Sequence, residues 1–362
     1  NKAVIRGLKN GSMSTLNAPE EFDLAKKLLE IHKWADMVRF SKSGGEACLI
    51  AIRIARAFSN KEKIAFCGYH GWHDWYMSAN LENKKNLDEQ LLPGLGNRGV
   101  SKTFKNSIFS FQYNNIESLK KIFKKNKNKI GIVIMEPMRF TKPKNNFLKK
   151  VKKISKENGA ILIFDEITSG FHENYGGLHL KFKVNPDLAI FGKALGNGYP
   201  ISAVIGKKKI MDSAQRTFIS STMWTDRLGF IAGVTSLNKM KKLQVQKKLV
   251  SLGKKIKRGW LIAAKKNKIN ISVSGLDSLP NFRFNYEKRK EMSTFFTQEM
   301  LKLGFLAKEA LAMTYVYNDK IIKKYLKSVD IVFKKIQVIN KTKVKFPLEG
   351  PVKHSTLKRI TF

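Results

Sequence analysis

The chain has 362 residues, 43% of them hydrophobic and 10% aromatic, enough to bury a sizeable core and to exclude disorder of the whole chain. Lys and Arg number 69 against 28 Asp and Glu, and the resulting formal net charge of +41 raises polyanion binding as a hypothesis. No apolar run reaches the ~18 residues of a membrane helix, and the N-terminus lacks the apolar stretch of a signal peptide, so we expect a cytoplasmic protein.

The lysines are densest at 119–129, 148–153 and 247–258. They fall at helical spacing between apolar residues, which is typical of the solvated faces of amphipathic helices. Nucleic-acid binding is therefore an unlikely role, although the charge should speed the encounter with anionic small molecules. Cys48 and Cys67 lie in apolar segments and are expected to be reduced core residues.

Short apolar runs alternate with helical patterns along the first two thirds of the chain. The predicted strands are 63–68, 107–111, 130–136, 160–166, 188–192 and 202–206, and the predicted helices between them include 44–58, 115–126 and 145–157. This alternation indicates a mainly parallel sheet in a large α/β domain, 1–235. A long basic helix over 236–268, short strands and helices near 290–303 and 318–337 predict a smaller α+β domain, 236–362.

The segment that opens the 44–58 helix has two interpretations. Ser43 and Glu46 have the spacing of a capping box, with Gly44 and Gly45 in the first turn. Glycines at this position also let an anion approach the free amides and the positive end of the helix dipole. An ordinary helix cap and a phosphate cradle both remain open.

Aromatic residues and histidines follow the predicted strand 63–68. Tyr69 and His70 could pack in the core, or one of them could stack on a flat cofactor ring. A metal site is disfavoured, because His70 and His73 have no companion ligands at a recognised spacing.

Three predicted strands end in chemically active residues. Glu136 closes one, Asp165 closes the next, and Lys193 follows the third. Ligands of open α/β sheets bind beyond the carboxyl ends of the strands, so we expect these residues to share one site. A lysine amine can form a Schiff base with a cofactor aldehyde, and a carboxylate can keep a pyridine nitrogen protonated.

Several motifs resemble, in order, the class III pyridoxal-phosphate (PLP) aminotransferases. They are SGGEA (43–47), YHGWHDW (69–75), EPM (136–138), DEITSGFH (165–172), PDLAIFGKALGNGYPISAVIG (186–206) and FISSTMWTDR (218–227). The chain looks most like the glutamate-1-semialdehyde 2,1-aminomutase branch, which FTQEMLKLGFLA (296–307) and GPVKHSTLKRIT (350–361) also resemble. The resemblance implies a fold-type-I PLP-dependent transferase.

The resemblance also implies roles for individual residues. Lys193 would hold PLP and then shuttle a proton, and Asp165 would pair with the pyridine nitrogen. Ile167 and Tyr69 would cover the two ring faces, with His70 beside them. Phosphate would bind at the turn formed by Ser43, Gly44 and Gly45.

Further implications concern the partner and the substrate. Ser221 and Thr222 lie where a second subunit usually completes the phosphate site, which implies a homodimer with shared active sites. Glu136 would be an acid beside the cofactor. No metal is expected, and the substrate would be a small amino, keto or aldehyde compound, handled by an aminotransferase or an aminomutase.

Two departures from the family pattern bear on the substrate. The segment EPMRFTKPK (136–144) lacks the second glutamate that several class III transaminases carry. The chain also begins late relative to the family, so we expect an N-terminal segment with substrate contacts to be missing. The alternative hypothesis, motivated by the charge, is a non-catalytic polyanion-binding protein on an aminotransferase fold.

Overall fold

The computed structural model describes residues 1–13, 15–83, 85–88, 90 and 96–353. The chain forms two compact units. The first comprises Asn1–Met138 and Lys142–Leu243, and the second comprises Arg139–Thr141 and the chain from Gln244 onward. The domain boundary predicted at 235/236 falls inside helix α9 (Arg227–Leu243) of the first unit. Of the tail motif over 350–361, residues 354–361 lie outside the described part of the chain.

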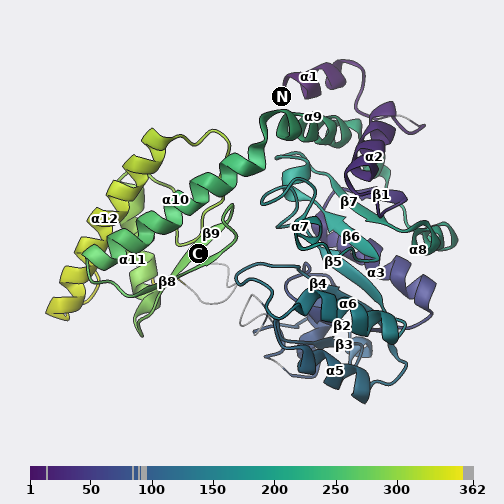
Figure 1. The fold of residues 1–362 in the computed structure, drawn as a ribbon, viewed down its shortest axis with the longest axis horizontal. Helices are drawn as coiled ribbons and strands as arrows, with labels where there is room; N and C mark the ends of the chain where they lie inside the picture. Colours follow the sequence, from purple (N-terminus) through teal and green to yellow (C-terminus); the bar gives the residue numbers. More distant parts are fainter. Residues whose placement is uncertain (14, 84, 89, 91–95, 354–362) are drawn as a thin grey trace. The chain divides into compact units, whose positions relative to one another are not determined.

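A seven-stranded sheet forms the centre of the first unit (Figure 1), with the strand order β1-β7-β6-β5-β4-β2-β3. The pairs among β2 to β6 are parallel, whereas β7 runs antiparallel to both of its neighbours. The strands are β1 (Met37–Ser41), β2 (Lys63–Cys67), β3 (Ile108–Ser110), β4 (Ile130–Met135), β5 (Ile161–Asp165), β6 (Leu188–Phe191) and β7 (Ser202–Gly206).

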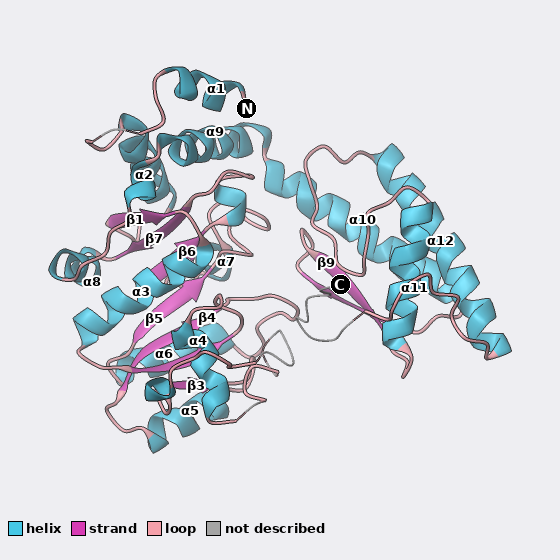
Figure 2. Ribbon diagram, turned by 180° about the vertical axis from the view of Figure 1, so that it is seen from behind, coloured by secondary structure: helices cyan, strands magenta, loops and turns pink. Residues whose placement is uncertain are grey.

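Both faces of the sheet are buried, which explains why its central strands are continuously apolar. Alternate residues of each strand point to opposite faces. One face packs on α3 (Gly44–Ser59), as Figure 2 shows. The other packs partly on α5 (Ile116–Lys125) and α6 (Phe147–Glu157) and partly on α2 (Pro19–Ile31) and α9.

Short elements complete the first unit. They are α1 (Lys2–Lys9), α4 (Asp74–Met77), α7 (Leu178–Phe182) and α8 (Lys208–Met211), with 3₁₀ turns η1 (Ser78–Leu81), η2 (Lys102–Phe104), η3 (Lys193–Leu195), η4 (Asp212–Arg216) and η5 (Thr222–Thr225).

The second unit packs three helices on a two-stranded antiparallel sheet. The helices are α10 (Val245–Lys266), α11 (Arg289–Lys302) and α12 (Asp319–Thr342), and the strands are β8 (Ile271–Gly275) and β9 (Pro280–Phe284). Its core holds a cluster of aromatic rings in edge-to-face contact, made of Phe282, Phe284, Phe296 and Phe333. None of the helices in the described ranges is long and apolar enough to cross a membrane.

Two differences from the predicted elements have physical explanations. The single helix predicted over 236–268 is wrong: Gln244 takes a left-handed backbone with φ of 47° and separates α9 from α10. Strand β1 was not predicted, because Arg39 interrupts the apolar residues of MVRFS. Its partner β7 defines it as a strand.

Candidate active site at the carboxyl edge of the sheet

A cavity of about 460 Å³ lies in the first unit. Many of its lining residues follow the carboxyl ends of β2, β5 and β6 or lie at the start of α3, as expected for a ligand site of a parallel sheet. The cavity brings together the predicted residues Gly44, Gly45, Tyr69, His70, Asp165, Ile167 and Lys193. Its other lining residues are Lys42, Gly71, Trp72, Thr168, Gly198, Tyr199, Pro200, Ile201 and Ser202.

The start of α3 forms a tightly enclosed cradle. Ser43 caps the helix, and the predicted capping box with Glu46 is present. A Cβ atom at Gly44 would lie 2.8 Å from Ile167 Cδ1, and one at Gly45 would lie 2.7 Å from His73 Cε1. No described hydrogen bond uses the backbone amides of Gly44 or Gly45. The cap and the anion cradle are therefore compatible: the Ser43 side chain serves the cap while these two amides stay available to an anion.

Asp165 is a buried carboxylate at the end of β5, 3% exposed. Its Oδ1 accepts the Ile167 amide at 3.0 Å, and its Oδ2 lies 2.8 Å from His70 Nδ1 and 3.5 Å from Cys48 Sγ. The His70 Nδ1 proton therefore faces the carboxylate. These contacts fix the acid in one orientation at the floor of the cavity.

Cys48, His70 and Asp165 together have the composition of a small metal site, with their ligand atoms within 4.8 Å of one another. Hydrogen bonding explains the cluster equally well. Burial, followed by the charge of Asp165, raises the pKa of the Cys48 thiol well above its usual value. A protonated thiol donates to the carboxylate, whereas a metal would need the thiolate.

Tyr69 and His70 take different positions after β2. Tyr69 is half-buried and lines the cavity, with its ring in edge contact with Tyr76. His70 is 1% exposed and directed at Asp165. Tyr69 is thus the better placed of the two to cover a flat ring.

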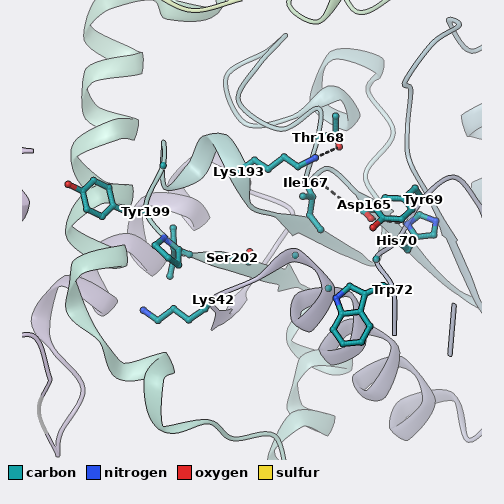
Figure 3. A pocket seen from close by; sticks show the side chains of 16 residues that line it. Lys42, Tyr69, His70, Trp72, Asp165, Ile167, Thr168, Lys193, Tyr199 and Ser202 are labelled. Carbon is teal, nitrogen blue, oxygen red and sulfur yellow. Dashed lines mark hydrogen bonds and ion pairs between the residues drawn. The ribbon is translucent and has the colours of Figure 1, made fainter. Parts of the chain in front are cut away.

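Lys193 opens η3, directly after β6, in a left-handed conformation with φ of 44°. Its Nζ lies 3.0 Å from Thr168 Oγ1 (Figure 3). Ile167, the residue before Thr168, packs between Gly44 and Gly192 and forms one wall of the cavity. The lysine amine and the Asp165 carboxylate thereby face a common space.

Glu166, next to Asp165, points to the opposite side and is fully buried. It accepts hydrogen bonds from the amides of Leu178 and His179, from His179 Nδ1 and from Ser169 Oγ. Burial would raise the pKa of Glu166, but the hydrogen bonds from His179, Ser169 and Leu178 hold it below the usual value. Glu166 therefore anchors the turn that carries Ile167 and Thr168.

Two of the remaining predicted residues do not face the cavity. The Ser43 side chain is occupied by the helix cap. Glu136, 6% exposed, accepts the Tyr69 amide at 3.2 Å and closes over Gly68, whose φ is 112°. Glu136 thus holds the backbone that presents Tyr69.

Ser221 and Thr222 are exposed on a loop outside the cavity, here called the 218–226 loop. Three cations hold it to the sheet and to α3. Arg53 donates to the Phe218 carbonyl at 2.8 Å, Arg39 donates to the Ile219 carbonyl at 2.5 Å, and Lys42 binds Asp226. Phe218 and Met223 are 84% and 59% exposed on this loop.

Sequence reasoning missed Thr168, Lys42, Trp72 and Cys48. The sequence did contain a signal for Thr168, because this residue lies in the motif DEITSGFH (165–172), between Asp165 and Lys193. No local signal pointed to Lys42 or Cys48, because their partners Asp226 and Asp165 are far away in the chain.

The residues present fit a phosphorylated pyridine cofactor. A Cβ atom at Gly44 or Gly45 would press on the side chain of Ile167 or His73, and the cradle offers available amides to a phosphate. The buried Asp165 offers a carboxylate to a ring nitrogen, and Lys193 offers an amine to an aldehyde in the same cavity.

Comparison with known proteins points to the same kind of cofactor. The profile of the aminotransferase class-III family matches residues 2–330. A relative from Cloacimonas acidaminovorans, a 3-aminobutyryl-CoA aminotransferase, is 30% identical over 308 residues, which cover 82% of this chain and 70% of the relative.

Solved structures share the fold. An omega-transaminase from Sphaerobacter thermophilus superimposes with a TM-score of 0.84 at 22% identity, covering 92% of this chain and 82% of its own. A transaminase solved with PLP bound gives a TM-score of 0.86 at 20% identity, covering 94% of this chain and 83% of its own. The fold is that of fold-type-I PLP-dependent transferases.

Proposed function

Because the chain belongs to the class III family of PLP-dependent aminotransferases, we propose that it moves an amino group between small molecules through Lys193 and Asp165. The observation that carries this proposal is the single cavity shared by the buried acid, the lysine amine and the glycine cradle. The family match and the shared cavity give no support to the alternative of a non-catalytic polyanion-binding protein.

PLP, when bound, supplies an aldehyde for amines and a ring that draws electrons from the substrate carbon. The residues of the chain do the rest. Gly44 and Gly45 would hold the phosphate, Tyr69 and Ile167 would enclose the ring, and Asp165 would hold a proton on the ring nitrogen. Lys193 would hold the aldehyde end of the cofactor at rest, and its amine would move a proton between carbon atoms during amino transfer.

We propose a homodimer in which the 218–226 loop of one subunit reaches the cradle of the other. Ser221 and Thr222 would then donate hydroxyl hydrogen bonds to the phosphate. Support comes from the exposure of these residues and of Phe218, Met223 and Trp72, large apolar side chains that a second subunit would cover.

For the substrate, we propose an amine whose amino group is remote from any α-carboxylate. Among the described residues that line the cavity there is no arginine, and the Lys42 ammonium is already paired with Asp226 at 2.9 Å. Within the described lining of this cavity, an α-carboxylate would therefore lack an arginine partner. The names of two similar proteins, a 3-aminobutyryl-CoA aminotransferase and an omega-transaminase, favour the same substrate class.

The second candidate activity is that of a glutamate-1-semialdehyde aminomutase, which is supported by the motif resemblance alone. The two activities differ in their need for a second substrate. An aminotransferase releases a carbonyl product and stops until an acceptor is added, whereas an aminomutase turns over a single substrate.

The experiment is absorbance spectroscopy of the PLP-loaded protein with a panel of amine donors, including β- and ω-amines and α-amino acids. We expect the visible band to bleach with β- or ω-amines and to recover when a carbonyl acceptor is added. Lys193→Ala should lose both the visible band and turnover. A fully active Lys193→Ala variant would exclude the assignment, and steady turnover of one substrate without an acceptor would favour the aminomutase.

A further inference from the structure

We infer that Thr168 is a positioning residue whose hydroxyl oxygen holds the Lys193 amine with its lone pair directed into the cavity. The inference rests on the proposed function, because it concerns the same lysine. Three features carry it: the fixed backbone of Lys193, the anchored turn that presents Thr168, and the 3.0 Å contact between them.

The backbone of Lys193 is fixed, but its side chain is long. The residue has a left-handed φ of 44°, and its carbonyl accepts the Asn197 amide at 3.0 Å. Beyond Cα, four rotatable bonds separate the amine from this rigid base, and a lysine side chain loses about 1.5–2 kcal/mol of rotamer entropy when it is ordered. A contact at the amine therefore helps to define where the nitrogen lies.

Thr168 is well suited to provide that contact, because its turn is held on both sides. The Ile167 amide donates to Asp165 Oδ1 at 3.0 Å, and the Gly170 amide donates to the Glu166 carbonyl at 2.6 Å. A Cβ atom at Gly170 would lie 2.7 Å from that carbonyl and from Phe191 Cδ1, so the turn is also closely packed. The backbone that carries the Thr168 hydroxyl is thus held in place.

The geometry has a chemical consequence. A neutral amine has one lone pair and two N–H bonds, so donating one N–H to Thr168 Oγ1 restricts the directions open to the lone pair. In cofactor capture that lone pair attacks the aldehyde carbon, a C=N bond forms and water leaves. In turnover it accepts the proton of the substrate C–H bond, whose electron pair remains on the substrate side. By orienting the Lys193 lone pair toward the cavity, Thr168 would favour both cofactor capture and proton transfer.

The test compares Thr168→Val, which removes the oxygen while keeping the shape, with Thr168→Ser, which keeps the oxygen. Cofactor-free protein is mixed with PLP, and the rate of appearance of the visible band gives the capture rate. Binding of pyridoxine 5′-phosphate, which has no aldehyde, is measured in parallel by fluorescence titration. Because a hydrogen bond contributes about 0.5–1.5 kcal/mol, we expect capture to slow by about 3- to 10-fold in the valine variant.

The expected pattern is slow capture by Thr168→Val, near-normal capture by Thr168→Ser, and pyridoxine 5′-phosphate affinity within about twofold of the unmodified protein in both, since the cradle is untouched. Capture by the valine variant at the unmodified rate would overturn the inference. So would equal slowing by serine and valine, or a loss of pyridoxine 5′-phosphate affinity that matches the loss of rate.

Turnover gives a second readout. With a donor deuterated at the reacting carbon, the isotope effect on kcat should be larger for Thr168→Val than for the unmodified protein, because proton transfer becomes more rate-limiting. An unchanged isotope effect together with a normal capture rate would count against Thr168. If the capture pattern is as expected but no donor turns over even in the unmodified protein, the proposed amino transfer fails and the role of Thr168 stands.

Discussion

At the scale of single residues, the site depends on how Asp165 is held. Three donors from separate parts of the chain, namely His70, Cys48 and the Ile167 amide, converge on one buried carboxylate. Hydrogen bonds offset the cost of burying a polar group. A carboxylate held in one orientation is what a protonated pyridine nitrogen requires.

Asp165→Asn tests this arrangement with little change of shape. The amide carries no charge, so it cannot stabilise a proton on the ring nitrogen. We expect the variant to retain PLP but to lose about 100-fold or more in kcat, the order of magnitude for loss of one preorganised electrostatic contact. Stopped-flow measurement of the first half-reaction checks it, with the surface variant Glu117→Gln as the control. Full activity of Asp165→Asn would exclude the proposed role.

At the scale of elements, the 218–226 loop is a surface segment with an unusually firm attachment. Its carbonyls at 218, 219 and 226 each accept a hydrogen bond from a cationic side chain of β1, of α3 or of the turn between them. The Lys42–Asp226 pair is partly enclosed, with side-chain exposures of 16% and 19%. In the proposed dimer, a loop that meets a second subunit would gain from such preorganisation, since less freedom would be lost on association.

Lys42→Met should weaken the proposed dimer without unfolding the subunit. Removing the ammonium leaves Asp226 with an uncompensated charge, and enclosed charged hydrogen bonds contribute about 1.5–3 kcal/mol. We expect the dimer dissociation constant from analytical ultracentrifugation to rise by about 10-fold or more.

PLP should be lost more readily from Lys42→Met as well, because the loop would complete the phosphate site. Lys120→Met is the matched control: Lys120 forms an exposed pair with Glu117, and such pairs contribute little. Equal dissociation constants for Lys42→Met and the control would refute the role of this tether.

At the scale of the whole molecule, the α/β architecture was predictable because buried parallel strands have a strong signature. Runs such as IGIVIM and AILIF are apolar throughout, and the helices between them have lysine-rich outer faces. The proximity of Asp165 and Lys193 was predictable in outline, since Asp165 ends β5 and Lys193 follows the neighbouring strand β6.

Other features depend on contacts between distant segments and leave no local pattern. The turn that anchors Thr168 depends on Glu166 meeting the start of α7, and β1 is defined by its pairing with β7. The break at Gln244 lies in a sequence that would also be acceptable inside a helix. The predicted division into two functional domains and the assigned site residues stay predictions.

Stability of the first unit should depend on pH through His32. This side chain is fully buried, stacks on His179 with ring centroids 5.3 Å apart, and donates from Nδ1 to the Leu28 carbonyl. Burial, followed by the proximity of His179, lowers the pKa of His32 from 6.5 to about 4. The unfolded chain therefore binds this proton more tightly than the folded protein does.

The stabilising contribution of His32 is present above pH 6.5 and is lost as the pH falls toward 4. Between pH 7 and pH 5 we expect a loss of about 2 kcal/mol in the free energy of unfolding from this residue. His32→Asn, which keeps a donor near Nδ1 but does not titrate, should show a correspondingly smaller loss. Urea unfolding at pH 7 and pH 5 measures the free energy of unfolding of both proteins. An equal loss between the two pH values in His32→Asn and in the unmodified protein would refute the assignment.

The neighbouring positions of β5 and β6 also bear on how this protein acquires its cofactor during synthesis. Asp165 pairs in register with Ile190, and Lys193 follows three residues later. The acid and the amine therefore become neighbours only when these two parallel strands have joined, a non-local event that comes slowly in folding. If Asp165 and Lys193 have the roles proposed above, the chain has no complete receptor for PLP before that event, and a PLP absorbance band would mark chains whose central sheet has finished assembling.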